Sequence, residues 1–472
     1  MKRYLGIFFI AVLLFGCAHY PANPKLDAYD KTKGYRFDAI SAPAGADRLF
    51  VILAFSGGGT RAAALSYGVL ETLRDTRFTW QGAGHDLLDE VDVISSVSGG
   101  SFTSAFYAQF GRDIFKNFES KFLYRDIQGE LEKLVLMPTS WLKLASPDYS
   151  RIDLAADFYN REIFEGKQFG DLIRRNQRPM AIINATDMTV GAPFTFIQSQ
   201  FDPICSDLSG VSLARAVAAS SCFPVAFAPL TVNNYAGSCR YSAPPWVELA
   251  LEDLQLNPPR YERARVLQSY LDGANRPYLH LLDGGVADNI GLRVPLASLR
   301  SNDPDLSVLR KINQGAIDLL VVIIVDAKTN QESDIDKTPS PPGLSSVLGK
   351  IATVPLDNYS FDTVQALRDE FAKWQSDSAN YVDCMDVLTS QCPGARMPFP
   401  PPRTVKLFPV YVGFDQIADP ARRRHFQTMK TSFHLPDTQV TELRQIAREL
   451  LEHSDAFNDL KDELKATMAP AP

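Results

Sequence analysis

Ser98 stands in a motif whose residue types and spacing suit nucleophilic chemistry. Residues 91–107 read VDVISSVSGGSFTSAFY. The β-branched start predicts a short buried strand, the small residues predict a sharp turn, and the later periodicity predicts a helix. A serine at the apex of such a unit is a nucleophile elbow, usually written G-x-S-x-G, and Ser96 is small enough to replace its first glycine. The serine would face free N–H groups at a helix start, which favour developing negative charge.

Another strand–turn–helix unit lies earlier in the sequence, before the one that contains Ser98. The apolar run 48–55 predicts a strand buried on both faces, and it leads into SGGGTR at 56–61. Gly57, Gly59 and Ala62 match a dinucleotide-binding fingerprint, so the turn has two interpretations. The other interpretation is an oxyanion hole, in which glycine N–H groups stabilise a tetrahedral oxyanion. A serine at the apex of the next unit favours the oxyanion hole. The N-terminus described below predicts export, and exported enzymes rarely use nicotinamide cofactors.

Asp283 is the candidate base. Residues 278–282 predict a strand, and it runs into Asp283-Gly284-Gly285. An aspartate before two glycines is common in turns. A serine hydroxyl, however, needs a base within hydrogen-bond reach before it can act as a nucleophile. His280 invites a triad, but strand alternation turns it away from the face of Asp283, so we expect a packing or hydrogen-bonding role for it.

Three motifs, SGGGTR, SVSGGS and DGGVADN, occur in this order, and the blocks INATD and AVAASSCFPVAF lie between the last two. Together they closely resemble the patatin-like phospholipase family over about residues 49–327. The resemblance implies an α/β class protein, with a three-layer α/β/α fold, a mainly parallel central sheet and helical insertions. It also implies a serine–aspartate dyad that hydrolyses acyl esters of lipids.

The resemblance carries over to individual positions. The family's nucleophile falls on Ser98 and its aspartate on Asp283. Ala62 stands where the family often has glycine, which leaves the local backbone geometry open. The oxyanion-hole motif of the family falls on Gly57, Gly58, Gly59 and Arg61.

The N-terminus has the anatomy of a secretory signal. Positive charges at Lys2 and Arg3 precede an apolar run at 5–15 that is too short to span a bilayer. Gly16-Cys17 then resembles the lipobox of bacterial lipoproteins, which implies cleavage before Cys17 and its lipidation. Ala18 is not the aspartate associated with inner-membrane retention, so we expect a lipid-anchored envelope protein at the outer membrane, facing the periplasm. A plain signal peptide with an incidental cysteine is the alternative.

The chain divides into four predicted parts: a signal peptide at 1–16, a tether at 17–47, a catalytic domain at 48–330, and a C-terminal extension at 331–472 packed on the catalytic domain. Proline-rich breaks at 329–345 and 396–403 support the last part. Within the catalytic domain, 133–145 (KLVLMPTSWLKLA) is strongly apolar. Its composition is more typical of a buried helix, and a surface that meets lipid is the alternative.

Composition excludes other classes of site. The formal net charge of −7 gives no indication of nucleic-acid binding, and no long basic run suggests binding to anionic lipid headgroups. No metal or other cofactor is expected, because metal-ligand spacings are missing. Two disulfides are predicted, because each pair brackets a polar, turn-rich segment, and Cys222 in an apolar run is expected to stay reduced. The predicted pairs are Cys205 with Cys239 and Cys384 with Cys392.

The sequence therefore predicts a lipid acyl-ester hydrolase of the phospholipase A or lysophospholipase type. Its substrates would be phospholipids or lysophospholipids, and its membrane contact would be through lipidated Cys17. A catalytically silent envelope scaffold with the same fold is the first alternative, and a dinucleotide-binding protein is the second. The sequence leaves the oligomeric state open.

Overall fold

A computed structural model describes residues 18–41, 48–80, 83–223, 227–303, 306–330, 341–392 and 404–466, together with residues 339 and 394. The predicted signal peptide and Cys17 lie outside these residues. So does all of the predicted break at 396–403. Among the described helices, none is long and apolar enough to cross a bilayer.

The core is a mixed sheet with the strand order β10-β9-β1-β4-β5-β8-β7, and β6 pairs with β5. The five strands from β10 to β5 run parallel to their neighbours, whereas β6, β7 and β8 are antiparallel. The strands are β1 (Leu49–Phe55), β4 (Val91–Val97), β5 (Met180–Asp187), β6 (Ala192–Thr195), β7 (Leu230–Asn233), β8 (Tyr278–Asp283), β9 (Leu319–Asp326) and β10 (Lys406–Gly413). A separate hairpin joins β2 (Arg77–Trp80) to β3 (Ala83–Asp86).

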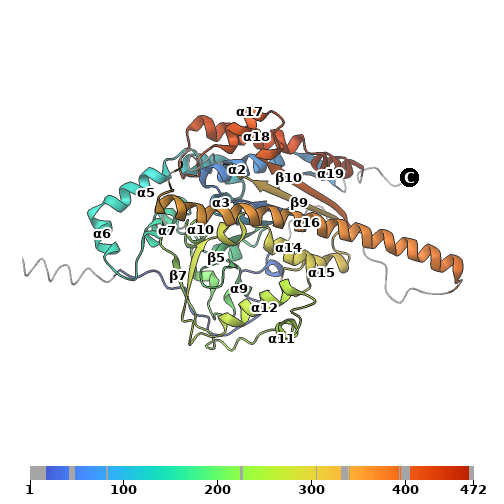
Figure 1. Cartoon of the computed structure of the whole chain (residues 1–472), viewed down its shortest axis with the longest axis horizontal. Coiled ribbons are helices and arrows are strands. Elements are labelled where there is room, and N and C mark those ends of the chain that lie inside the picture. Colours follow the sequence, from blue (N-terminus) through green and yellow to red (C-terminus); the bar gives the residue numbers. More distant parts are fainter. Residues whose placement is uncertain are drawn as a thin grey trace, which may run out of the picture.

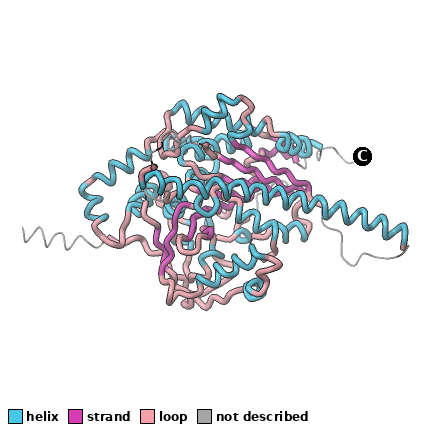
Figure 2. Tube along the Cα trace, viewed as in Figure 1, coloured by secondary structure: helices cyan, strands magenta, loops and turns pink. Residues whose placement is uncertain are grey.

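Helices lie on both sides of this sheet (Figures 1 and 2), as the predicted three-layer α/β/α fold requires. They are α2 (Gly59–Asp75), α3 (Gly99–Phe110), α4 (Ile114–Phe118), α5 (Ile127–Leu136), α6 (Pro138–Leu144), α7 (Arg151–Glu162), α8 (Phe169–Arg175), α9 (Gln198–Phe201), α10 (Leu213–Ser220), α11 (Trp246–Leu251), α12 (Pro258–Tyr270), α13 (Gly285–Asp288), α14 (Arg293–Arg300), α15 (Val308–Asn313), α16 (Leu344–Gln391), α17 (Pro420–Gln427), α18 (Asp437–Glu452) and α19 (Asp455–Ala466). Every residue of β1, β4, β5 and β9 is buried. Continuous apolar strands of this kind are stable only when both faces are covered.

Residues beyond 330 complete the same core. β10 adds a parallel strand to the edge of the sheet beside β9. α18 lies against α2 at the top of Figure 1, and Arg444 on α18 donates to both carboxylate oxygens of Glu71 on α2. The buried apolar side chains of α18 face this interior; they are Val440, Leu443, Ile446, Ala447, Leu450 and Leu451. The C-terminal extension is therefore part of the central sheet as well as a layer upon it.

The segment predicted as a tether is packed on the body wherever the structure describes it. Tyr35 and Phe37 are buried in the main core. The Leu26 and Tyr29 N–H groups donate to carbonyl groups of the Cys205–Cys239 region, at 2.8 and 2.9 Å. Burial of these aromatic side chains therefore attaches the described part of the predicted tether to the folded body.

The cysteines follow one predicted pairing and contradict the other. Cys205 and Cys239 form a disulfide, and Cys222 is a buried free thiol. Cys384 and Cys392 are exposed free thiols. Cys384 lies in α16, which ends directly before Cys392. Eight residues of helix span about 12 Å, which is too far for a disulfide, so the predicted turn-rich loop is wrong here.

The apolar stretch 133–145 forms the end of α5 and all of α6, which project from the body at the left of Figure 1. The favoured prediction of a buried helix is wrong. Leu136 and Trp141 are 69% and 58% exposed. The only buried residues of α5 are Ile127 and Leu131, near its start.

Candidate active site

Ser98 lies at the apex of the turn that joins β4 to α3. Its φ of 49° is in the left-handed region, which a non-glycine residue adopts only when its surroundings enforce it. The glycines behind it permit the close packing. A Cβ added at Gly99 would lie 2.0 Å from the Gly59 carbonyl oxygen, and one at Gly100 would lie 2.7 Å from the Ser56 carbonyl oxygen. The two predicted strand–turn–helix units therefore meet backbone to backbone at the nucleophile elbow.

Asp283 reaches the same place from the opposite direction. It ends its strand as predicted, but this strand, β8, runs antiparallel to β5, whereas β4 runs parallel to β5. Val97 pairs with Asn184, and the adjacent Ala185 pairs with Asp283, so the register brings Asp283 to the level of Ser98. Its chain then crosses the end of β5 closely, because a Cβ at Gly284 would lie 2.1 Å from the Asn184 carbonyl oxygen.

The carboxyl group of Asp283 is buried, and burial raises its pKa to about 7. Two hydrogen bonds oppose this shift, one from the Gly285 N–H at 2.8 Å and one from the Ser98 side chain. Desolvation disfavours the ionised form, whereas donors to a carboxylate favour it. The outcome is an acid–base group that titrates near neutral pH and is hydrogen-bonded to a serine hydroxyl.

Ser220, at the end of α10, holds both halves of the site together. The Ser98 N–H donates to its hydroxyl oxygen at 2.9 Å, and the Gly284 N–H donates to its carbonyl oxygen at 3.1 Å. Its own hydroxyl donates to the Asn184 carbonyl oxygen at 2.6 Å. Ser220 was not assigned this role from the sequence. The adjacent pair of serines in AVAASSC was the available signal.

The glycine loop contributes fewer free N–H groups than we expected. The Gly57 N–H donates to the Asn289 carbonyl oxygen at 2.9 Å, so it is already occupied. In the described part of the chain, the N–H groups of Gly58 and Gly59 donate no hydrogen bond, and their φ angles of 139° and 59° require glycine. Gly57 has another role, because a Cβ there would lie 3.2 Å from the Ser98 Cβ. Its missing side chain leaves room beside the serine.

A further donor follows the serine directly. Gly99 is the first residue of α3, where a helix leaves its N–H without an internal partner. The hydrogen bonds among the described residues assign it no acceptor. The nucleophile-elbow pattern itself was the signal, because the oxyanion hole of such sites uses the residue after the nucleophile. Gly58, Gly59 and Gly99 thus form the set of available donors.

Arg61 is not a donor of the oxyanion hole. Its buried guanidinium donates to the carbonyl oxygens of Ala327 and Met429, at 2.9 and 2.8 Å, and to the Thr431 hydroxyl at 3.0 Å. Burial lowers its pKa to about 10. The side chain holds the C-terminal part of the chain against the glycine loop. This structural role replaces the predicted role of Arg61 in the oxyanion hole. The motif gave no sign of this role, because its partners lie far away in sequence.

The segment 428–435 lies directly against the glycine loop. The Thr60 N–H donates to the Ser432 carbonyl oxygen at 2.8 Å, and a Cβ at Gly59 would lie 2.3 Å from the same oxygen. Phe433 packs edge-on against Phe102, one turn beyond Ser98. Protein atoms therefore occupy the position over the helix start where a dinucleotide pyrophosphate would bind, which argues against the dinucleotide interpretation.

His280 lies where strand alternation predicted. Along β8, Leu279, Leu281 and Asp283 are buried, whereas His280 is exposed. Its ring nitrogen shares a hydrogen bond of 3.3 Å with the Thr231 hydroxyl. His280 therefore faces away from the Ser98–Asp283 pair.

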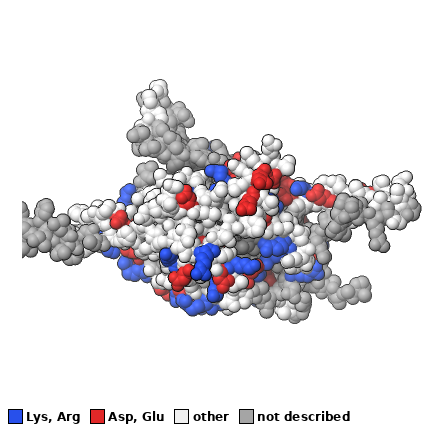
Figure 3. All heavy atoms as spheres, turned by 90° about the horizontal axis from the view of Figure 1, so that it is seen from below, with Lys and Arg blue, Asp and Glu red and all other residues white. Residues whose placement is uncertain are grey.

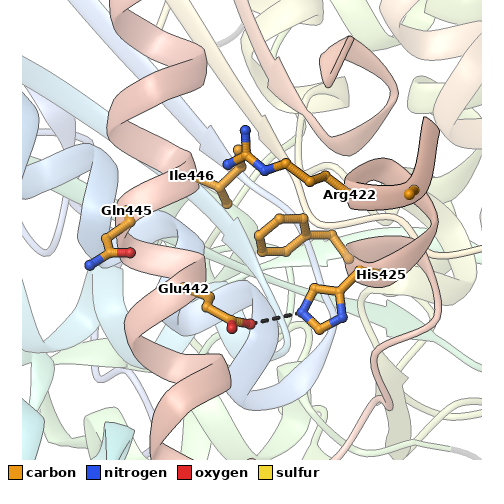
Figure 4. A pocket seen from close by; sticks show the side chains of 7 residues that line it. Arg422, His425, Glu442, Gln445 and Ile446 are labelled. Carbon is orange, nitrogen blue, oxygen red and sulfur yellow. Dashed lines mark hydrogen bonds and ion pairs between the residues drawn. The ribbon is translucent and has the colours of Figure 1, made fainter. Parts of the chain in front are cut away.

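A hollow of about 380 Å³ lies elsewhere, between α17 and α18 (Figure 4). Its polar wall consists of Arg422, of Gln445, and of an ion pair of 2.8 Å between His425 and Glu442. These side chains are solvated, and Arg422 is paired with Glu449 outside the hollow, so they provide no activated nucleophile. Among the described residues, no three His, Cys, Asp or Glu side chains are grouped to hold a metal ion.

Two similar solved structures are human GIVD cytosolic phospholipase A2 and VipD from Legionella pneumophila, both 12% identical to the chain, with TM-scores of 0.43 and 0.25. The alignments cover 89% and 92% of this chain, and 62% and 72% of those chains. No curated protein matches the sequence significantly. The family model of the patatin-like phospholipases matches residues 53–296, more than half of the chain and all three motifs. The chain belongs to the patatin-like phospholipase family.

Proposed function

We propose that this protein hydrolyses acyl esters of phospholipids or lysophospholipids, with Ser98 as the nucleophile and Asp283 as the base. The hydrogen-bonded pair of Ser98 and a buried carboxylate with a pKa of about 7 carries the proposal. A general base is most effective when its pKa lies near the working pH. Membership of a phospholipase family supports a lipid ester as the substrate.

The reaction would proceed in two halves. The Ser98 Oγ attacks the ester carbonyl carbon while its proton passes to Asp283. The tetrahedral intermediate collapses, and the leaving alcohol takes the proton from Asp283, which leaves an acyl-serine. Water then attacks the acyl group, with Asp283 again accepting the proton, and the fatty acid leaves as Ser98 recovers its hydrogen.

The developing oxyanion would be stabilised by the N–H groups of Gly58, Gly59 and Gly99. These groups are fixed before the reaction, because backbone contacts of Gly59 and Gly99 hold the two turns together. Each such donor is worth on the order of 3 kcal/mol in comparable sites. The close approach that only glycine permits is therefore part of the proposed catalytic machinery.

We also propose that Cys17 is the mature N-terminus and carries a lipid anchor, so that the protein acts in the cell envelope, at the outer membrane. The charged start, the short apolar run and the Gly16-Cys17 junction motivate this step. Metabolic labelling with a fatty acid should mark the native protein and leave Cys17→Ala unmarked. Labelling that persists in the variant would contradict the anchor.

The hydrolase proposal is tested with the purified protein and vesicles of phosphatidylethanolamine and phosphatidylglycerol. Mass spectrometry should detect free fatty acid and the matching lysophospholipid or glycerophospho-alcohol, and Ser98→Ala should lose this activity by at least about 1,000-fold. Ser66→Ala is the matched control, because it removes a buried serine hydroxyl that has no hydrogen-bond partner among the described residues.

A water-soluble short-chain ester separates chemistry from lipid access in the same samples. Release of acid from this ester by the native protein, with its loss in Ser98→Ala, is the expected result. A folded native protein that hydrolyses neither the vesicle lipids nor the soluble ester would favour the silent scaffold. Undiminished hydrolysis by folded Ser98→Ala would reject the mechanism.

A further inference from the structure

We infer that the end of α5 and the adjoining α6 form a second membrane contact, which inserts apolar side chains into the lipid surface. The inference extends the proposed function, because it assigns the surface that brings the site to its lipid substrate. The α5–α6 tip, as we name it, consists of exposed Leu136, Met137, Trp141 and Leu142.

The exposure of the tip is unusual for its residue types. Its four side chains are exposed by 69%, 48%, 58% and 44%, in the order given. They are close together in sequence, at the end of α5 and on α6, and Figure 1 shows these two helices projecting from the body at the left of the molecule. Clustered large apolar side chains on a soluble surface mark a site of interaction with protein or membrane.

Trp141 is held in a way that suits a lipid interface. Its indole Nε1 donates to the Val135 carbonyl oxygen at 2.9 Å, a bond that links α6 back to α5. The polar atom of the side chain is thus satisfied within the protein, and the ring remains largely exposed. Tryptophan is enriched at membrane surfaces, because its amphipathic ring is stable at the level of the headgroups.

Charge favours a membrane as the occupant. The stretch 133–145 contains Lys133 and Lys143 and no acidic residue. Lys143 is half exposed and forms an ion pair of 3.3 Å with Asp157. In Figure 3 the end of the molecule that carries α6 is mostly uncharged, and both basic and acidic side chains border it. An apolar tip without a carboxylate can enter a lipid surface, while the long side chains of Lys133 and Lys143 reach back to the level of the headgroups.

The N-terminal end of the described chain is fixed beside the same tip. The Tyr20 N–H donates to the Asp148 carbonyl oxygen at 2.9 Å, and His19 lies 3.2 Å from the Asp148 carboxylate. Asp148 follows shortly after the end of α6. Two residues of extended chain, from Cys17 to His19, span at most about 7 Å. A lipid on Cys17 would therefore enter the bilayer close to the α5–α6 tip.

The other end of α5 contacts the segment over the glycine loop. The Gln128 N–H donates to the Phe433 carbonyl oxygen at 3.3 Å, and the Ser432 hydroxyl donates to the Gln128 side chain at 2.6 Å. α5 has 10 residues and is therefore about 15 Å long. The tip and the segment over the glycine loop are therefore separated by about the length of α5. This length is less than half of the 40–45 Å thickness of a bilayer with its headgroups, so the site would stay near the membrane surface when the tip is inserted.

The test uses the native protein, purified in detergent and reconstituted in vesicles of phosphatidylethanolamine and phosphatidylglycerol that contain brominated acyl chains. Bromine quenches the fluorescence of tryptophan residues that enter the acyl region. The difference between the native protein and Trp141→Phe isolates Trp141 from Trp80, Trp246 and Trp374. We expect at least half of the Trp141 emission to be quenched.

Charged substitutions should then keep the α5–α6 tip out of the bilayer. Leu136→Asp with Leu142→Asp should abolish the quenching of Trp141 and lower hydrolysis of vesicle lipid at least tenfold. The matched control is Leu249→Asp with Leu256→Asp, which charges two leucines that are 61% and 90% exposed at and after α11, far from α6 in Figure 1. This control should change neither reading by more than twofold.

The outcomes separate the two proposals. Hydrolysis of a soluble ester should be the same in the tip variant and the native protein, which also shows that the variant folds. Unquenched Trp141 in the native protein, or equal losses in the tip and control variants, would overturn the inference even if hydrolysis occurs. Quenched Trp141 in a protein that hydrolyses no ester would reject the proposed function and leave the membrane contact standing.

Discussion

The Ser98–Asp283 region and the α5–α6 tip treat side chains in opposite ways. Around Ser98, polar side chains are buried and several are held by fixed hydrogen bonds, such as the one that the hydroxyl of Ser220 receives from the Ser98 N–H. At the tip, apolar Leu136 and Leu142 extend into solvent with little packing behind them. Burial of polar groups and exposure of apolar groups both cost free energy in an isolated protein.

The difference indicates two kinds of function. A buried carboxylate with a raised pKa is suited to moving a proton, and it needs an interior that excludes water. An exposed apolar cluster is suited to contact with another phase, and it needs only to project from the body. One region would carry the chemistry and the other would carry the approach to lipid. Three predictions test the buried side of this comparison, and the tip variants above test the other side.

Asp283→Asn should give the largest effect. The amide cannot accept the proton of Ser98, so hydrolysis of a soluble ester should fall by about 1,000-fold, near 4 kcal/mol in activation free energy. His280→Ala is the control from the same strand, and it should retain activity within about tenfold because its ring is on the exposed face. Initial rates of the purified variants decide the matter. Equal losses in the two variants would assign the proton transfer to a histidine triad instead.

Arg61→Met should act on the fold. The substitution removes three hydrogen bonds to Ala327, Met429 and Thr431 and leaves buried acceptors without donors. We expect a loss of about 3 kcal/mol in the free energy of unfolding. Arg74→Met, in the same helix, breaks an exposed ion pair with Asp75 and should cost less than about 1 kcal/mol. Denaturant unfolding of both variants measures the difference. Similar midpoints would contradict the role of Arg61 in holding the C-terminal part of the chain to the glycine loop.

The pH dependence of hydrolysis should give the smallest effect. The base must be ionised, and burial raises the pKa of Asp283 to about 7. The rate on a soluble ester should therefore fall about tenfold for each pH unit below 7 and level off above pH 8. A midpoint near pH 4 would mean that Asp283 is solvated in the working enzyme.

The same group has a converse effect on stability. Because the folded state holds the proton of Asp283 more tightly than the unfolded chain does, its contribution to stability is lost as the pH rises from about 4 to 7. Asp283→Asn removes this loss, so the variant should be at least as stable as the native protein at pH 8. Unfolding measured at pH 8 thus checks that an inactive variant is a folded one.

Much of the site could be predicted from short stretches of sequence. The nucleophile elbow at Ser98 and the strand ending at Asp283 are local patterns in which residue size and alternation dictate the backbone. The exposure of His280 followed from alternation alone. Ser220 and Gly99 were missed, although the elbow pattern could have indicated Gly99. The role of Arg61 was assigned wrongly because its acceptors lie in segments remote along the chain.

The sequence by itself determined the two strand–turn–helix units and their glycines, because positive φ angles and close backbone contacts exclude other residues. Only the tertiary structure decided the rest. Register across β5 brings Asp283 to Ser98 from an antiparallel strand, and residues beyond 330 add an edge strand to the sheet. Apolar composition could not tell a buried helix from the exposed α5–α6 tip, since burial depends on which neighbours the whole fold supplies.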